Sequence, residues 1–153
     1  MNPVFETVKA AVDKADFMKL LCIGAPPDEY DMESAMIAAQ MSKQSTADEI
    51  AGLITETFAK MFGTAPMPAE TVSGAANEIA ANCIFPTDAD IAVCDECGSR
   101  FLKSSSRMTA LCPECASILY GYKNCKHRFV NGNCVKCLWD GSRSAFILRS
   151  ITE

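Results

Sequence analysis

Apolar residues recur at helical spacing through much of the first half of the chain. From Val4 to Cys22 they fall three or four positions apart, and Gly24 ends the run together with two prolines. A second helix is predicted from about residue 29 to residue 41. Acidic side chains gather at its start, where the helix dipole favours negative charge. They are Asp28, Glu29, Asp31 and Glu33.

The third predicted helix has the clearest boundaries. Ser45 and Thr46 each have an acid three positions later, which is a capping-box signature, and an apolar stripe then runs as far as Gly63. A fourth helix opens near Pro68, because proline suits a first helical turn, and it ends before Pro86. The short connections between these helices predict a compact antiparallel bundle.

Charge and cysteine content change together near residue 90. Residues 1–90 carry 14 acids and 5 bases, a net of −9, whereas residues 91–153 carry 5 acids and 9 bases, a net of +4. Seven of the nine cysteines lie in the second part. The sequence therefore predicts an acidic helical bundle over 1–90 and a β-rich double-zinc module over 91–153. The fold class expected for the whole chain is mainly α.

The stretch GAPPDEYDMESAMI, followed by STADEIAGLITETFAKMF, resembles a small all-helical bacterial domain of unknown function. That domain has a Gly/Pro-rich turn, then D-E-Y-D, then an (S/T)-x-x-E-(I/L)-A helix entry. The resemblance covers about residues 15–65. It implies protein binding without catalysis. The matching residues are Asp28, Glu29, Tyr30, Asp31, Glu33, Thr46, Glu49, Ile50 and Ala51.

The acids before the second helix admit several interpretations. They are ordinary helix caps, with Tyr30 half-buried in the core, or they form an edge that contacts a partner protein. A catalytic or Mg²⁺ site is a further alternative, but it requires partners from elsewhere in the fold that the sequence does not identify. If the acids do bind a partner, the contacting residues are Asp28, Glu29, Asp31 and Glu33.

Two C-x2-C pairs in the second part predict a first zinc site. Two residues between cysteines let both sulfurs of a tight turn reach one ion at about 2.3 Å, and two such turns complete a tetrahedron. The segment at 91–118 therefore resembles a zinc ribbon, with both turns expected on a short hairpin. The predicted ligands are Cys94, Cys97, Cys112 and Cys115.

The segment CKHRFVNGNCVKC contains the only histidine of the chain and predicts a second zinc site. Asn131-Gly132 is a strong hairpin-turn signal, and centring the turn there sets Phe129 opposite Cys134. His127 then lies diagonally beside Cys134 on the same face. A zinc hairpin is thus predicted over 122–140, with three thiolates and one imidazole. The predicted ligands are Cys125, His127, Cys134 and Cys137.

Eight donors suffice for two structural Zn²⁺ ions with closed tetrahedral shells. The alternative is a cross-braced arrangement, in which the first and third pairs share one ion and the second and fourth share the other. The Asn-Gly hairpin favours the sequential partition, because it brings the last two pairs together. Cys22 and Cys83 remain, and we expect them to act as small hydrophobes on helical faces.

The donor sets do not favour catalysis. Catalytic zinc keeps one position open for water, whereas these sets are full. Cys94-Asp95-Glu96 resembles part of the nucleobase deaminase signature, but Leu111 rather than proline precedes Cys112. The sequence contains no H-E-x-x-H, P-loop or G-x-S-x-G pattern. We therefore expect a protein that is not an enzyme.

The basic residues of the second part, mixed with aromatic ones, make nucleic acid the main alternative partner. Two zinc ions (+4) against seven thiolates (−7) contribute −3, however, and this nearly cancels the +4 of that part. The acidic helices also repel polyanions. The sequence therefore favours a regulatory protein whose partner is a protein with a basic surface. A nucleic-acid-binding regulator stays the alternative.

The start of the chain has acids in its first turns and no basic segment leading into an apolar one, so it does not have the pattern of a secretory signal. No apolar run approaches the roughly 18 residues that a membrane span needs. We expect a cytoplasmic protein that does not bind membranes, because clustered cysteines in a reducing compartment hold metal more often than they form disulfides.

Overall fold

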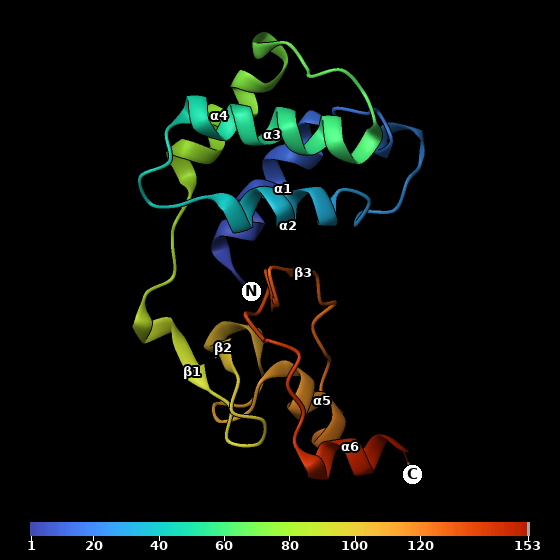
Figure 1. The fold of residues 1–153 in the computed structure, drawn as a ribbon, viewed down its shortest axis with the longest axis vertical. Helices are drawn as coiled ribbons and strands as arrows, with labels where there is room; N and C mark the ends of the chain where they lie inside the picture. Colours follow the sequence, from blue (N-terminus) through green and yellow to red (C-terminus); the bar gives the residue numbers. More distant parts are fainter. Residues whose placement is uncertain (153) are drawn as a thin grey trace. The chain divides into compact units, whose positions relative to one another are not determined.

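The computed structural model describes residues 1–152, and the chain divides into two compact units (Figure 1). The helical unit comprises Pro3–Phe85. The cysteine-rich unit comprises Met1–Asn2 together with residues from Pro86 onwards, so the first two residues belong with the C-terminal part. None of the helices in the described range is long and apolar enough to cross a bilayer.

The helical unit contains four α-helices, α1 (Pro3–Ala15), α2 (Asp31–Gln40), α3 (Ala47–Phe62) and α4 (Ala69–Asn82), and one 3₁₀ turn, η1 (Leu21–Ile23). Helix α1 packs against α2 and α4, and α3 packs against the same two helices. Their apolar stripes meet in a core whose largest fully buried side chains include Tyr30, Phe5 and Phe58. The expected bundle is therefore present (Figure 1).

Helix α3 begins and ends where the sequence predicts. The Thr46 side chain accepts a hydrogen bond from the Glu49 amide, and the Glu49 side chain accepts one from the Thr46 amide. Gly63 ends the helix with φ at 63°, a conformation that costs glycine little.

Helix α1 ends at Ala15, although its apolar spacing continues to Cys22. Asp16 and Lys19 both have positive φ, which ends the helix. The Asp16 carboxylate accepts hydrogen bonds from the Leu21 and Cys22 amides and, at 2.6 Å, from the Tyr30 hydroxyl. Burial opposes charge on this carboxyl, but these bonds lower its pKa to about 2. A tertiary contact thus overrides the local pattern.

The described part of the cysteine-rich unit has two short antiparallel hairpins and two α-helices. The first hairpin pairs β1 (Ile91–Val93) with β2 (Arg100–Leu102), and the second pairs β3 (Phe129–Val130) with β4 (Asn133–Cys134). The helices are α5 (Pro113–Tyr120) and α6 (Ala145–Thr152), and single 3₁₀ turns flank the first hairpin at Asp88–Asp90 and Lys103–Ser105.

The content of regular structure confirms the expected class, mainly α with a small β-containing C-terminal part. The sequence reading of that part as β-rich missed α5 and α6. The apolar pattern of each helix extends over a short stretch of sequence, because each helix has 8 residues.

Candidate metal centres

The first cluster joins the turn of a hairpin to the start of a helix. Cys94 and Cys97 lie in the connection between β1 and β2, whereas Cys112 and Cys115 lie at the N-terminus of α5. Their four sulfur atoms all lie within 4.8 Å of one another. The second pair is therefore carried by a helix and not by a hairpin strand. Cys112 is the N-cap, and its sulfur accepts a hydrogen bond from the Cys115 amide at 3.4 Å.

The second cluster forms around the β3–β4 hairpin. Asn131 and Gly132 both have positive φ, at 54° and 87°, as a tight turn requires, and Phe129 pairs with Cys134 in the predicted register. The donor atoms of this cluster also lie within 4.8 Å of one another. They belong to Cys125, His127, Cys134 and Cys137. The eight donors thus form two groups in sequence order, and the cross-braced alternative is not the arrangement found.

The first pair of the ribbon and the last pair of the chain share one backbone design. The Gly98 amide donates to the Cys94 carbonyl, and the Leu138 amide donates in the same way to the Cys134 carbonyl. The fifth residue of each turn, counted from its first cysteine, has a left-handed conformation, with φ at 75° for Gly98 and 72° for Leu138. The same turn is therefore built once with glycine and once with leucine, which adopts this conformation at a cost.

The imidazole of His127 is held from two sides. Its Nδ1 lies 3.5 Å from the sulfur of Cys137, and its Nε2 lies 3.2 Å from a carboxylate oxygen of Glu114. The rings of Phe129 and Trp139 lie 5.7 and 4.6 Å away between centroids. The nitrogen that faces the sulfurs is thus Nδ1.

The buried sulfurs of the first cluster oppose one another's negative charge. Burial and repulsion from neighbouring sulfurs raise the pKa of Cys112 to about 12 and also raise the pKa of Cys115. Burial opposes charge on Cys94 as well, but backbone hydrogen bonds lower its pKa. The thiols cannot all be thiolates at neutral pH without a cation, and a divalent ion removes that conflict.

The second cluster shows a similar conflict between charges. Hydrogen bonds with neighbouring cysteines lower the pKa of Cys134 and raise the pKa of Cys137. Burial disfavours charge on His127, yet hydrogen bonds with the sulfurs of Cys125 and Cys134 raise its pKa to about 10. A bound metal ion would take the place of that proton. Four sulfurs, or three sulfurs and one imidazole, are donor sets that zinc prefers.

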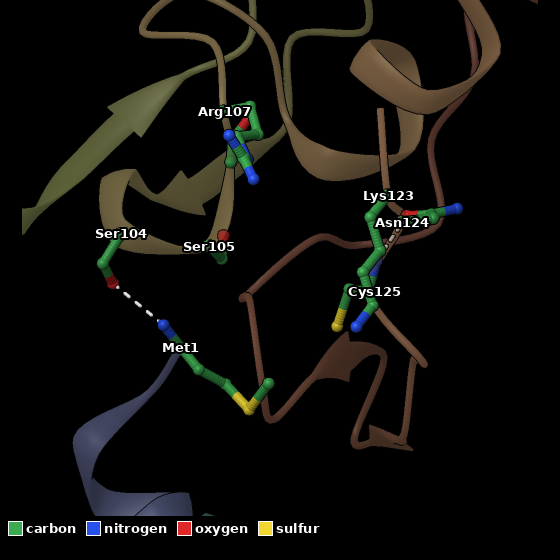
Figure 2. A pocket seen from close by; sticks show the side chains of 8 residues that line it. Met1, Ser104, Ser105, Arg107, Lys123, Asn124 and Cys125 are labelled. Carbon is green, nitrogen blue, oxygen red and sulfur yellow. Dashed lines mark hydrogen bonds between the residues drawn. The ribbon is translucent and has the colours of Figure 1, made fainter. Parts of the chain in front are cut away.

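Solvent reaches the second cluster through a shallow pocket of about 300 Å³ (Figure 2). Cys125 lines it and is half-buried, whereas Cys134 and Cys137 are buried. Ser104 lies on another wall, where its hydroxyl accepts a hydrogen bond from the Met1 nitrogen at 3.1 Å. Cys125 is thus the candidate ligand of this cluster that faces a solvent-accessible pocket.

The two remaining cysteines belong to neither cluster. Cys22 is exposed, and its thiol donates a hydrogen bond to the Lys19 carbonyl. Cys83 follows α4 and is half-buried, and burial raises its pKa. The expectation of small hydrophobes on helical faces is therefore wrong for Cys22, because the helix to which it was assigned ends at Ala15.

The four acids proposed as a partner edge differ in exposure. Asp31 and Glu33 are buried, at 2% and 5% exposed, whereas Asp28 is half-buried and Glu29 is exposed. Asp31 forms an ion pair with Lys9 at 2.8 Å. Burial, followed by the nearby acids, raises the pKa of Glu33. Within the predicted edge, Asp28 and Glu29 are the residues that reach solvent.

Sequence analysis missed Glu114. This residue is 5% exposed and lies between Cys112 and Cys115, where the spacing of the cysteines draws attention to the sulfurs alone. Its contacts with Asn124, His127 and Arg143 come from 10, 13 and 29 residues away. A carboxylate inside a C-x2-C pair was the one available signal, and the sequence does not indicate its partner.

Comparison of the chain with family models, with curated proteins and with solved structures gave no match. The resemblance of residues 15–65 to a bacterial helical domain therefore has no support from these comparisons. Assignment of function rests on the two clusters and on the surfaces around them.

Proposed function

We propose that this protein is a zinc-binding regulatory protein that acts by binding another protein and catalyses no reaction. The observation that carries the proposal is the closure of both donor sets. Each cluster has four protein donors within 4.8 Å of one another, which fills a tetrahedral zinc shell and leaves no position for substrate or water. Two such ions would act as structural elements of the unit that holds them.

The apolar core that surrounds the two clusters supports a structural role for the ions. Ligand cysteines from both clusters belong to one buried apolar group that also contains Phe101, Trp139 and Ile147. A unit of this size buries little apolar surface, so ion binding contributes much of its folding free energy. The ions would thus hold a rigid module in place.

The helical unit supplies the surface that we assign to the partner. The first 90 residues carry a net charge of −9, and such a field steers a basic partner and repels polyanions. Six of the eight methionines lie in this unit and all six are at least partly exposed, and Met32 and Met36 lie one turn apart on α2. Flexible, polarisable methionine side chains suit an adaptable protein contact. Asp28 and Glu29, at the start of α2, would provide the charged edge of this surface.

Nucleic acid binding by the cysteine-rich unit is the second candidate. Arg107, Lys123 and Lys126 are exposed there, and the Phe129 ring is 43% exposed. Two other cations are already used inside the unit, since Lys136 is buried and Arg143 pairs with Glu114 at 2.7 Å. This use of the cations and the acidity of the whole chain favour the protein partner.

The test is capture of partners from native lysate, with and without nuclease, followed by mass spectrometry. We expect a basic protein whose capture survives nuclease. Glu29→Lys should slow its association and flatten the salt dependence, with little change in melting temperature, because Glu29 is exposed. Glu70→Lys is the matched control, since Glu70 is an exposed acid in the first turn of another helix, α4.

One result would reverse the assignment. If the intact protein binds generic RNA or duplex DNA at micromolar concentration in physiological salt, and the binding requires Lys126 and Arg128, the cysteine-rich unit is the recognition surface. Equal effects of Glu29→Lys and Glu70→Lys on association would instead show that net charge matters and that the start of α2 has no special role.

A further inference from the structure

Glu114 connects the two clusters. It lies in the sequence between two cysteines of the first cluster, and its carboxylate contacts the histidine of the second. One oxygen accepts from Asn124 and lies 3.2 Å from His127 Nε2, and the other accepts two hydrogen bonds from Arg143, at 2.7 and 3.2 Å. All of these contacts lie within the cysteine-rich unit. A buried carboxylate with this many fixed partners has little freedom to move.

The contact with Glu114 determines which nitrogen of His127 can bind an ion. A neutral imidazole carries its proton on one nitrogen and a lone pair on the other. A carboxylate beside Nε2 favours the proton there, so the lone pair lies on Nδ1, the nitrogen found 3.5 Å from the Cys137 sulfur. Carboxylates that accept from metal-bound histidines both orient the ring and increase its basicity.

We propose that Glu114 is a positioning residue for the second zinc site, supplied by the ligand turn of the first. The inference rests on the proposed zinc sites. Closing the Cys112–Cys115 turn around the first ion fixes the start of α5, and with it the carboxylate that orients His127. The second site then depends on the first, and the dependence is reciprocal, because coupling between two binding equilibria acts in both directions.

Other contacts also join the two clusters, and the experiment must separate them from Glu114. The Leu102 amide donates to the Cys137 carbonyl at 2.9 Å, and both clusters share apolar neighbours. These contacts stabilise the unit as a whole. They do not select a nitrogen of His127. The tautomer of the imidazole therefore depends on Glu114, and a change in the overall stability of the unit does not alter it.

The first measurement uses Glu114→Gln, which keeps the shape of the side chain but has only one acceptor oxygen for His127 and Arg143. We expect its zinc affinity at the second site, measured by chelator competition, to fall about 10- to 100-fold. Glu96→Gln is the matched control. Glu96 has the equivalent place in the first C-x2-C turn and also accepts from the C-terminal segment, through the Ser144 hydroxyl, but it is not a partner of His127. It should leave the second site unchanged.

A double-mutant cycle isolates the action through the imidazole. In a His127→Cys background the fourth ligand is a thiolate, which has no tautomer to select. Glu114→Gln should then leave second-site affinity unchanged. An equal loss of affinity in both backgrounds would overturn the proposal, since Glu114 would then act on the fold and not through His127.

A measurement on the unaltered protein keeps the proposal testable even if a variant fails to fold. Because His127 is the only histidine, the two-bond ¹H–¹⁵N spectrum of the cadmium-loaded protein contains one imidazole. We expect ¹¹³Cd coupling to Nδ1 and a proton on Nε2. Cadmium on Nε2 would overturn the proposal. Failure of the unaltered protein to bind two ions is a separate outcome, and it would reject the proposed zinc sites themselves.

Discussion

Chelation of zinc should unfold the cysteine-rich unit and leave the helical unit folded. One buried cluster of the cysteine-rich unit comprises ten of the described residues, and five of these are cysteines of the two candidate metal sites. A structural zinc site contributes about 10–16 kcal/mol in small zinc-binding peptides. A whole domain is stable by only about 5–15 kcal/mol. The free energy that is lost with the ions therefore exceeds the stability that the remaining apolar contacts can provide.

Two spectroscopic signals follow the two units separately. Trp139 is the only tryptophan and is 3% exposed, so its emission should shift to longer wavelength as chelator removes the ions. Far-UV circular dichroism should decrease only in part, because α1–α4 lie in the helical unit and contain most of the helical residues.

The thiol count provides the quantitative check. The protein should contain two zinc ions per chain and two reactive thiols, Cys22 and Cys83, because the other seven of the nine cysteines belong to the proposed zinc sites. Cys22 should react faster, because it is exposed and Cys83 is half-buried. All nine should react after chelation. Nine reactive thiols before chelation, or Trp139 emission that does not change after zinc is removed, would refute this account of the core.

Three further predictions concern single sites. His127→Ala should weaken the second site more strongly than the first, so that the second ion is lost at a lower chelator concentration. His127→Cys should restore two ions per chain, and metal analysis reads both outcomes. Gly98→Ala should lower the free energy of unfolding by about 1 kcal/mol and Leu138→Gly should raise it by a similar amount, because both positions have a left-handed backbone. If denaturation without chelator shows that both variants change this free energy in the same direction, the reasoning is wrong. The pKa of Asp16 is about 2 against its usual 3.8, so its hydrogen bonds stabilise the helical unit above about pH 4, and this stabilisation is lost as the pH falls through 2. Asp16→Asn should remove this acid transition from a circular dichroism titration, and an identical transition in both proteins would show that another group causes it.

The sequence predicted best what neighbouring residues decide. The capping pair Thr46 and Glu49 marks the start of α3, because the two residues bond to each other across one helical turn. Asn131-Gly132 marks the β3–β4 turn, since both residues must accept positive φ. The grouping of donors in sequence order follows from that turn. These features needed no information from distant parts of the chain.

The features that the sequence did not reveal depend on contacts between distant residues. Helix α1 stops at Ala15 because the Asp16 carboxylate bonds to Tyr30, which the apolar spacing does not indicate. Burial of Asp31 and Glu33 follows from packing within the helical unit, whereas the pattern of acids indicated a solvated edge. The role of Glu114 requires Arg143 and His127 to approach from separate segments.

The position of Asn2 has a consequence for the order of folding. Its amide and its side chain donate to the Lys136 and Val135 carbonyls, both at 2.8 Å, within the turn that links the last two ligand cysteines. These contacts join residues 133 or more positions apart, whereas the four helices between them pair over shorter separations. During synthesis the helical unit can therefore fold from its own contacts, whereas the two hydrogen bonds from Asn2 to Val135 and Lys136 can form only after the last zinc-binding turn has left the ribosome. Completion of the cysteine-rich unit then comes later than folding of the helical unit, and it depends on the zinc supply at that later time.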